Sequence, residues 1–434
     1  MAKPNLITIV GTTGVGKSKL SVALAKALNG EVVNADSMQM YAGLDTITNK
    51  HPVEEREGVP HHLLGHIKDR ELEYSVIQFE SEADNVVESV LQRQKVPILV
   101  GGTHYYIYSY LFKNKTIAGE NSSAELPADE VEFLDNAPTS ELFERLQSVD
   151  PLIAAKFHPR DRRKLRRALE ICLVTGQRPS DIYASQKLPA VVEHTARFRT
   201  LVFWVWSKPE SLDPRLRSRV DDMVAKGALL DEVREMAELY KSLDPRPGMD
   251  RGIWQVIGFK EFLPYIRTND REDQGRGLDD MKRGTIKYAS SQIKWIRKKL
   301  LVAAASEPDV TVVLLDASDL SKWDSELNPN AVAIATDFLA GKEIEQPRLA
   351  PESLQDMLTP LAEKDHSAKQ ETWKHYRCDI CVENGENYVC TSGELWKIHL
   401  RSRRHRRTIK HAAEKEAFER WKASKSADQD SIVQ

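Results

Sequence analysis

The segment Gly11–Ser18 has the residue types and spacing of a phosphate-binding loop. It reads Gly-Thr-Thr-Gly-Val-Gly-Lys-Ser and matches G-x-x-x-x-G-K-[ST] in full, directly after the apolar run Leu6–Val10. In such a loop backbone N–H groups turn toward phosphate oxygens, Lys17 supplies a positive charge and the Ser18 hydroxyl can bind Mg²⁺. A tight strand-to-helix turn without a ligand is disfavoured because the motif and its flanking elements agree.

The loop indicates a diphosphate or triphosphate but does not identify ATP. Enzymes that hydrolyse nucleotides normally place an aspartate that holds Mg²⁺ at the end of an apolar strand. The best such strand, Pro97–Val100, is followed by Gly101-Gly102-Thr103 instead. This weakens the interpretation as a kinase or ATPase and leaves room for a substrate whose diphosphate is the leaving group.

Asp36 is a second candidate for chemistry. It follows the predicted strand Glu31–Asn34, and the carboxyl ends of strands form the ligand-binding edge of an open α/β sheet. A carboxylate beside a phosphate loop could act as a general base or as an indirect Mg²⁺ ligand. It could equally be a helix N-cap. The residue types alone leave these interpretations open.

The pairs Cys378-x2-Cys381 and His399-x5-His405 have the spacing of a zinc finger, with 17 residues between them. The long loop and the wide histidine gap resemble the matrin or U1-type finger. Cys390 lies between the pairs and could replace one of these ligands, although a small buried side chain is the favoured interpretation. Residues 397–410 contain seven Lys or Arg and no acid, which suits a nucleic-acid backbone.

Charge is clustered within a nearly neutral chain. The sequence has 62 basic and 65 acidic residues, yet 160–167 has six Lys or Arg in eight positions and a second basic cluster lies over 282–299. Such runs fit phosphate binding, although a solvated charged face is the common alternative. Four cysteines are too few for a disulfide scaffold, and no apolar stretch is long enough to span a membrane.

Strands and helices alternate in the first hundred residues, which predicts an α/β fold with a parallel sheet. Helices are predicted over Lys17–Leu28, Val76–Gln94, Glu141–Gln147, Arg162–Thr175, Arg215–Tyr240 and Lys282–Ala304, with further strands at Leu201–Trp206 and Thr311–Leu315. We expect a P-loop core over 1–115 and 197–320, a helical insertion over 116–196, a linker with a few short helices over 321–370, a C2H2-type zinc finger over 371–412 and a tail over 413–434. Disorder is expected for the last residues of that tail, Ser424–Gln434.

Six segments occur in an order that resembles the tRNA dimethylallyltransferase (tRNA isopentenyltransferase) family, over roughly residues 5–300. The carboxy-terminal finger resembles the eukaryotic branch of that family. The segments are Gly11–Ser18, Asp36-Ser-Met-Gln39, Val100-Gly-Gly-Thr103, Arg167-Ala-Leu-Glu170, Arg219-Val-Asp-Asp-Met223 and Gln255-Val-Ile-Gly258-Phe-Lys260-Glu261.

The resemblance implies transfer of a dimethylallyl group from its diphosphate to N6 of the adenosine immediately 3′ of a tRNA anticodon. Asp36 matches the base and Thr103 a residue that holds the amine, while Lys17 and Arg219 stabilise the leaving diphosphate. The implied diphosphate-binding residues are Thr13, Gly14, Val15, Gly16, Lys17 and Ser18. The implied tRNA-binding residues are Asp36, Ser37, Met38, Gln39, Arg163, Lys164, Arg167 and Gln255.

The expected cofactors are Mg²⁺, held through Ser18, and a structural Zn²⁺ held by Cys378, Cys381, His399 and His405. The expected partners are the tRNA anticodon stem-loop and dimethylallyl diphosphate, with no membrane. We expect a monomer in the cytoplasm, with the mitochondrion and nucleus as further compartments.

One segment departs from the family pattern. Lys287–Gln292 reads Lys-Tyr-Ala-Ser-Ser-Gln, with two serines where relatives carry basic residues. Two rival functions also remain. A P-loop kinase or nucleotide hydrolase with an RNA-binding finger leaves the six ordered segments unexplained. An RNA-binding protein with a vestigial loop conflicts with the intact Lys17, Ser18 and Asp36.

Overall fold

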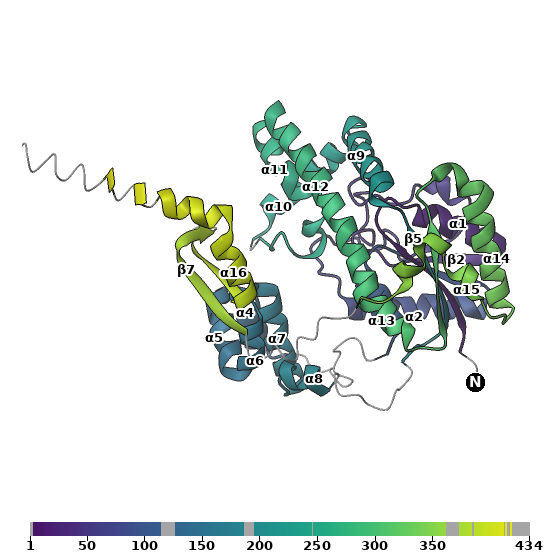
Figure 1. Ribbon diagram of the computed structural model, residues 1–434, viewed down its shortest axis with the longest axis horizontal. Helices are drawn as coiled ribbons and strands as arrows, with labels where there is room; N and C mark the ends of the chain where they lie inside the picture. The colour runs from purple at the N-terminus through teal and green to yellow at the C-terminus, as the bar shows by residue number, and fades with distance from the viewer. Residues whose placement is uncertain are drawn as a thin grey trace, which may run out of the picture. The chain divides into compact units, whose positions relative to one another are not determined.

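The chain forms two compact units, each built from two separate stretches of sequence (Figure 1). The computed structural model describes residues 3–113, 126–185, 195–244, 246–361, 373–383, 386–411, 413–414 and 417–418. Unit 1 comprises Met1–Thr116 and Val192–Ala362, and unit 2 comprises Ile117–Val191 and Glu363–Gln434. Most of the expected tail over 413–434 therefore lies outside the described residues. No helix in the described part of the chain is long and apolar enough to cross a bilayer.

Unit 1 is built on a six-stranded parallel sheet with the order β3-β2-β4-β1-β5-β6. Its strands are β1 (Asn5–Gly11), β2 (Gly30–Asn34), β3 (His61–His62), β4 (Val96–Val100), β5 (Arg199–Trp206) and β6 (Val310–Asp316). The predicted α/β class with a parallel sheet is confirmed. Only the two-residue strand β3 has no counterpart among the predicted strands, because a pair of histidines lacks the apolar run that marks a strand.

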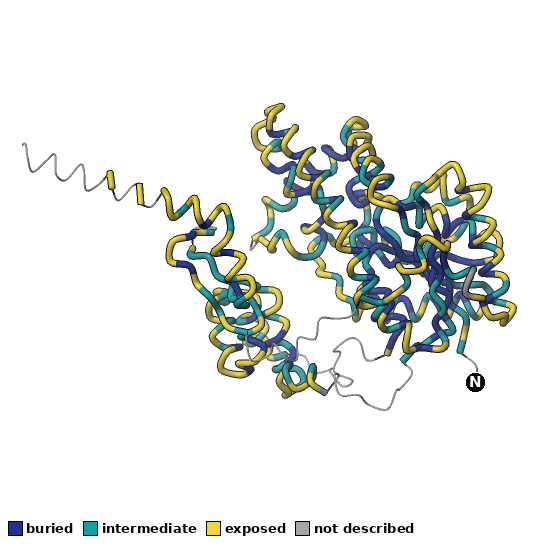
Figure 2. Tube along the Cα trace, in the orientation of Figure 1, coloured by how far each residue is buried: buried dark blue, intermediate teal, exposed yellow. Residues whose placement is uncertain are grey.

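Both faces of this sheet are covered, so its strands are apolar on both sides. In β1, Ile7 and Ile9 pack on the side of α1 (Lys17–Leu28) and α14 (Asn328–Leu339), whereas Leu6 and Val10 pack in the second core. Figure 2 shows the dark-blue buried trace running through these strands. The second core is formed with α2 (Val76–Gln92), α3 (His104–Leu111) and the helices that precede β6.

Two predictions of elements in unit 1 need correction. The helix predicted over Arg215–Tyr240 is two helices, α9 (Pro209–Ala225) and α10 (Ala228–Ser242), because Gly227 adopts a left-handed φ of 78° between them. The helix predicted over Lys282–Ala304 begins earlier, at Arg271, as α12 (Arg271–Trp295), and continues through the π-turn Ile296–Leu300 into α13 (Leu301–Ala305). α11 (Phe259–Thr268) precedes α12.

The linker expected over 321–370 is wrong for its first part. Trp323, Leu327, Ile334 and Phe338 are buried in the core around α1, and α14 packs directly against that helix. The apolar positions are spaced for a helix, but the neighbouring prolines hid that pattern. α15 (Gln346–Leu349) and the 3-10 turn Glu352–Leu358 follow. Residues 362–370 lie outside the described part of the chain.

Unit 2 combines the helical insertion with the finger. The insertion contains α4 (Ala128–Asn136), α5 (Thr139–Val149), α6 (Pro151–Lys156), α7 (Arg162–Thr175) and α8 (Pro179–Ser185), which enclose a small core of their own. The finger is an antiparallel hairpin of β7 (Trp373–Glu383) and β8 (Glu386–Ser392) followed by α16 (Gly393–Arg401). Residues 403–411 continue as helix after a bend at Ser402.

Candidate active site

Three loops meet at the carboxyl edge of the sheet in unit 1. The phosphate loop follows β1, Gly101–Thr103 follows β4, and Asp36 follows β2. Because β2, β4 and β1 are consecutive neighbours in the sheet, their carboxyl ends lie side by side. This is the edge at which open α/β sheets bind ligands.

Two glycines let the β4 loop approach Asp36. A Cβ added at Gly101 would lie 2.2 Å from the Ala35 carbonyl oxygen, and one added at Gly102 would lie 2.7 Å from Asp36 Oδ2. Ala35 N–H also donates to the Val100 carbonyl at 2.8 Å. Gly101 and Gly102, which stand where a nucleotidase has its aspartate, therefore allow the loop after β4 to pack closely on Ala35 and Asp36. A side chain at either position would push the Asp36 segment away.

Asp36 and Thr103 are held in one small network. The Met38 backbone N–H donates to Asp36 Oδ1 at 3.2 Å, and the Ser37 N–H donates to Thr103 Oγ1 at 2.9 Å. The Ser37 and Thr103 hydroxyls lie 3.0 Å apart. Thr103 is the N-cap of α3 but makes no side-chain capping bond there, so its hydroxyl faces the Asp36 segment instead.

The phosphate loop has the expected geometry, with left-handed φ angles of 80° at Gly14 and 93° at Gly16. The Thr13 hydroxyl accepts a hydrogen bond from Arg219 Nη2 at 3.0 Å, which brings α9 onto the loop. Lys17 Nζ donates to the Thr12 carbonyl at 2.7 Å. Of the two expected cationic residues, Lys17 lies in the loop motif itself, at the start of α1, and Arg219 contacts the loop from α9.

Electrostatics couple Lys17 to Asp36. Burial lowers the pKa of Lys17 to about 8, an effect that Asp36 opposes and Arg219 reinforces. Burial likewise raises the pKa of Asp36, and the positive charge of Lys17 offsets part of that rise. A carboxylate with a raised pKa is a stronger base than an ordinary aspartate, which suits proton abstraction.

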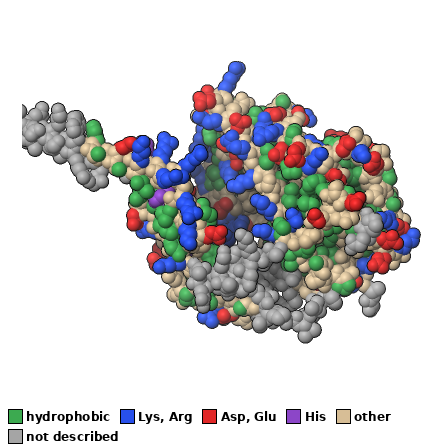
Figure 3. All heavy atoms as spheres, viewed as in Figure 1, with side chains coloured by type: hydrophobic (Ala, Val, Ile, Leu, Met, Phe, Trp, Pro, Cys, Tyr) green, Lys and Arg blue, Asp and Glu red, His purple; other side chains and the backbone are tan. Residues whose placement is uncertain are grey.

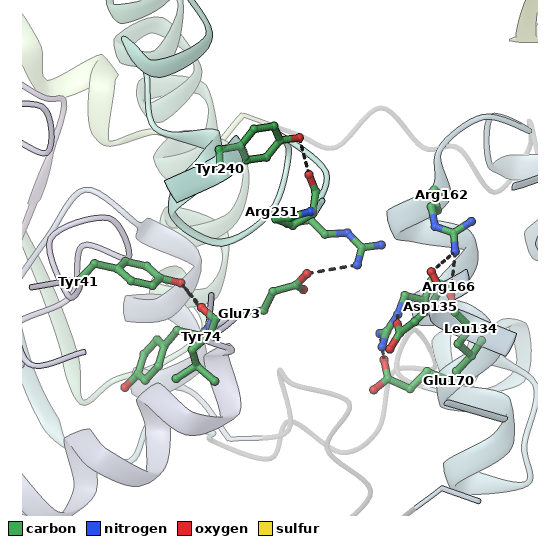
Figure 4. Close-up of polar contacts among 12 residues, drawn as sticks. Tyr41, Glu73, Tyr74, Leu134, Asp135, Arg162, Arg166, Glu170, Tyr240 and Arg251 are labelled. Carbon is green, nitrogen blue, oxygen red and sulfur yellow. Dashed lines mark hydrogen bonds and ion pairs between the residues drawn. The ribbon is translucent and has the colours of Figure 1, made fainter. Parts of the chain in front are cut away.

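The other residues expected to bind tRNA in unit 1 lie near this edge or on the surface. Ser37, Met38 and Gln39 follow Asp36 directly, and Gln39 Nε2 donates to the Asn49 carbonyl at 2.9 Å. Gln255 is exposed and donates to the Gly252 carbonyl at 3.1 Å. A nearby loop is tied down by the Tyr41 hydroxyl, which donates to the Leu72 carbonyl at 2.7 Å (Figure 4).

The basic side chains of α7 in unit 2 fall into two groups, those that bond to α4 and those that are exposed. Arg162 Nη2 donates to the carbonyls of Leu134 and Asp135 at 3.1 and 2.7 Å, and Arg166 Nε meets Asp135 Oδ1 at 2.7 Å (Figure 4). These bonds attach α4 to α7. Arg163, Lys164 and Arg167, the three expected to bind tRNA, are exposed, although Lys164 pairs with Asp161 and Arg167 with Glu170.

The finger brings its four expected ligands together. The donor atoms of Cys378, Cys381, His399 and His405 all lie within 4.8 Å of one another, and all four residues are buried. His399 Nε2 has no hydrogen-bond partner among the described residues, which fits a nitrogen that binds a metal. Two thiolates and two imidazoles in this arrangement suit tetrahedral Zn²⁺.

Cys390 stands outside that cluster. It is buried, and its thiol lies 3.9 Å from the Ser392 carbonyl. It therefore has the role expected of a small buried side chain.

The finger docks on the insertion helices through backbone contacts. Arg160 Nη2 donates to the Asn387 carbonyl at 2.6 Å and Arg160 Nε pairs with Glu386 at 2.7 Å. His158 Nε2 lies 3.0 Å from the Val389 carbonyl, and His375 Nε2 lies 2.9 Å from the Phe157 carbonyl. The basic run at 160–167 thus begins with a residue that holds the finger.

Comparisons with known proteins agree with this geometry. The IPP transferase family model matches residues 39–299, which is more than half of the chain. The chain belongs to the IPP transferase family. It is 42% identical over 428 residues to the tRNA dimethylallyltransferase of Saccharomyces cerevisiae. The matched residues cover 97% of this chain and 95% of that protein. The human tRNA dimethylallyltransferase is 32% identical over 421 residues, covering 93% and 86% of the two chains.

Among solved structures, the chain is similar to one described as a eukaryotic dimethylallyltransferase acting on tRNA. The TM-score is 0.77 at 42% identity, with 96% of this chain and 100% of that chain covered. The resemblance to this transferase family that the ordered motifs indicated is therefore confirmed. Within the IPP transferase match lie Thr103, Arg219 and Gln255, whereas the phosphate loop precedes it and the finger follows it.

The structure of this IPP transferase also places residues at the site that the sequence did not single out. Gln292 reaches the phosphate loop from α12, His104 lies 3.3 Å from the Gly11 N–H, and Trp323 packs on Gly16. No local pattern marks them, because each reaches the loop only through tertiary packing. The segment Lys287–Gln292 departs from the family pattern in its two serines, and nothing in that pattern predicts the contacts of Gln292.

Proposed function

We propose that this chain transfers a dimethylallyl group from dimethylallyl diphosphate to N6 of the adenosine immediately 3′ of a tRNA anticodon. The observation that supports the proposal is that Asp36, after β2, and Lys17, after β1, lie at one edge of the sheet and their charges interact there, as expected of a base beside a diphosphate site. The names of the relatives with high coverage support the same chemistry.

In the proposed reaction the C–N bond to the adenine forms as the allylic C–O bond to the diphosphate breaks. The N6 amine is a weak nucleophile because its lone pair is delocalised into the ring. Asp36 takes one N6 proton, so that the product amine is neutral, and Thr103 orients the amine through its hydroxyl. An adenine in an unpaired loop can be flipped out of its stack at a cost of a few kcal/mol.

The departing diphosphate gains negative charge, and the loop stabilises it. Lys17 and Arg219 supply positive charge, and the N–H groups of Gly14, Val15, Gly16 and Ser18 supply hydrogen-bond donors. The Thr13 N–H is used by Gln292, but its hydroxyl, which accepts from Arg219, keeps its own proton to donate to a phosphate oxygen. The hydroxyl of Ser18 is a hard oxygen donor at a partly exposed position, which suits Mg²⁺. A bound Mg²⁺ would neutralise diphosphate charge.

We assign the binding of the tRNA backbone to unit 2. Arg163, Lys164 and Arg167 are exposed on α7, and the helix that ends the finger presents a further basic surface, defined by Lys397, Arg401, Arg403, Arg404, Arg406, Arg407 and Lys410. Figure 3 shows Lys and Arg side chains gathered at this end of the finger. Such contacts give affinity and register and carry little sequence information.

The proposal is tested with purified protein, dimethylallyl diphosphate and unmodified tRNA. Mass spectrometry of the digested tRNA should detect N6-isopentenyladenosine at one position beside the anticodon. Replacing dimethylallyl diphosphate by ATP should give no product and no phosphate release, and Lys17→Ala should lose most of the activity. ATP hydrolysis without prenyl transfer would favour the P-loop hydrolase instead.

A further inference from the structure

Gln292 joins two loops of the candidate active site with one side chain. Its Oε1 accepts the backbone N–H of Thr13 in the phosphate loop at 2.9 Å. Its Nε2 donates to the backbone carbonyl of Gly102, in the loop after β4, at 2.9 Å. The residue is 3% exposed and belongs to α12, so it reaches both loops from a third element.

An amide of this length meets both demands. Thr13 offers a donor and Gly102 an acceptor, so the bridging group must accept at one end and donate at the other. A carboxylate would set an acceptor against the Gly102 carbonyl, and a lysine would set a donor against the Thr13 N–H. A buried amide with both groups satisfied has one orientation, which makes it a rigid spacer.

The two bridged residues lie on different sides of the proposed reaction, Thr13 beside the leaving diphosphate and Gly102 beside the base Asp36. Thr13 receives Arg219 on its hydroxyl and lies in the loop that binds the leaving group. Gly102 directly precedes Thr103, and a Cβ on it would lie 2.7 Å from Asp36 Oδ2 and 3.1 Å from Gln292 Nε2. Gln292 therefore connects the leaving-group side to the acceptor side.

We propose that Gln292 is a positioning residue that holds the diphosphate loop and the acceptor loop at the separation which in-line transfer requires. This inference rests on the proposed function. Tyr288, one helical turn earlier, supports it because its hydroxyl donates to the same Gly102 carbonyl at 3.2 Å. Neither residue need touch a reacting atom, since both act through the Gly102 carbonyl.

The test compares three variants of the full-length protein with the wild type. Gln292→Met keeps the side-chain volume and removes both hydrogen bonds. Tyr288→Phe removes the second donor to the same carbonyl at a less buried position, so it remains informative if the first variant folds poorly. The control is Thr285→Val, which removes a buried hydroxyl of α12 that, within the described part of the chain, donates only to the Met281 carbonyl of its own helix.

The measurements are kcat, KM for tRNA, the inhibition constant of inorganic diphosphate and Tm. For Gln292→Met, kcat should fall on the order of 100-fold, because a misplacement of about 1 Å costs that much. KM for tRNA and the inhibition constant should stay within about threefold of wild type, an amount worth less than about 1 kcal/mol. Tyr288→Phe should lower kcat less, and Thr285→Val should leave kcat unchanged whatever its Tm.

Two outcomes would overturn the positioning role. If kcat of Gln292→Met and Thr285→Val falls in proportion to Tm, the amide is merely structural. If inorganic diphosphate binds Gln292→Met much more tightly than wild type, the amide competes for the Thr13 N–H and is not a spacer. The wild-type protein in the same assay reports separately on the proposed function, because it forms product only if that function is right.

Discussion

Asp36 illustrates how one carboxylate can serve local structure and chemistry together. The sequence left open whether it is an N-cap or a base, and the structure finds it accepting the Met38 N–H while coupled to Lys17. A carboxylate has about four lone-pair sites, so the local hydrogen bond leaves capacity for a substrate proton. The nearby glycines 101 and 102 make room for this group.

We predict that Asp36→Asn abolishes prenyl transfer while tRNA affinity changes by only a few-fold. The amide has the size of the carboxyl group but cannot take a proton from N6, and loss of a general base costs roughly 100-fold to 10,000-fold in rate. Single-turnover product formation and filter binding of tRNA measure the two effects. Turnover within tenfold of wild type would refute the assignment of Asp36 as the base.

The pH profile of kcat/KM for dimethylallyl diphosphate should have two limbs. The alkaline limb should fall near pH 8, because burial lowers the pKa of Lys17 to about 8 and the amine loses its charge above that pH. The acid limb should lie above the ordinary aspartate range, because burial raises the pKa of Asp36 and the base is inactive when protonated. Lys17→Arg should remove the alkaline limb, since arginine stays charged.

At the scale of elements, Glu31 ties β2 to its neighbours at the end of the sheet remote from the active site. Its carboxylate meets Lys95, Arg93 and His62 at 2.7, 2.6 and 2.7 Å while only 4% exposed. Burial acts to raise its pKa, but hydrogen bonds from these three residues outweigh it and lower the pKa to about 2. The charged carboxylate is therefore stabilised in the folded state.

Glu31→Gln should lower the free energy of unfolding by about 3 kcal/mol at neutral pH, as the shift in pKa implies. The folded-state pKa lies below the unfolded value, so this contribution is complete above pH 4.5 and disappears as pH falls toward about 2. Urea titrations should show the free energies of unfolding of the two proteins approaching each other as pH falls from 7 to about 2. The exposed Glu88→Gln is the control and should change stability little at any pH.

The docking of the finger depends on Arg160 more than on its exposed neighbours. Arg160→Ala should free the hairpin from the insertion helices and raise KM for tRNA about tenfold, or 1.4 kcal/mol, while zinc content stays at one per chain. Limited proteolysis should cut between the core and the finger faster. Arg163→Ala should weaken tRNA binding without that change in proteolysis, and equal proteolysis of the two variants would contradict the docking role.

Local patterns predicted most long elements and missed those defined by packing. α1 and α7 begin and end where predicted, since each has a clear apolar face and α7 is capped by Asp161. The break at Gly227 and the core position of α14 were not predicted. A glycine within a helical pattern is ambiguous, and prolines near α14 suggested a linker although Pro329 only occupies the first turn of the helix.

At the scale of the molecule, local patterns likewise predicted the site residues that belong to motifs and missed those that reach the site through packing. Asp36, Thr103, Lys17 and Arg219 carry sequence motifs, and the structure brings all of them to one edge of unit 1. Gln292 and Trp323 were not predicted because their roles exist only once α12 and the segment after β6 pack on the phosphate loop. The docking of the finger on the insertion was missed for the same reason, since a long separation in sequence suggested independence.

Zinc should matter for tRNA affinity and not for the bond-making step. Cys378→Ser should release zinc and unfold the finger, because so small a module has little core without its metal. KM for tRNA should rise, kcat at saturating tRNA should recover, and the salt dependence of binding should weaken by roughly 0.7–0.9 in the log–log slope for each lost phosphate contact. An unchanged slope with a lasting loss of kcat would place the finger's role in catalysis.

The discontinuity of both units has a consequence for how the chain is made. On a ribosome the phosphate loop emerges before β5 and β6, which extend the sheet beside it, and before Trp323, which packs on Gly16, because the insertion is made in between. The insertion in turn is made before β5, β6 and the finger on which it packs. Domains generally fold as units during synthesis, so both nascent units must stay incomplete until these later segments are made. A chain that stops early at residue 320 should therefore leave the ribosome with neither unit finished, and chaperones should hold it longer than the full-length protein.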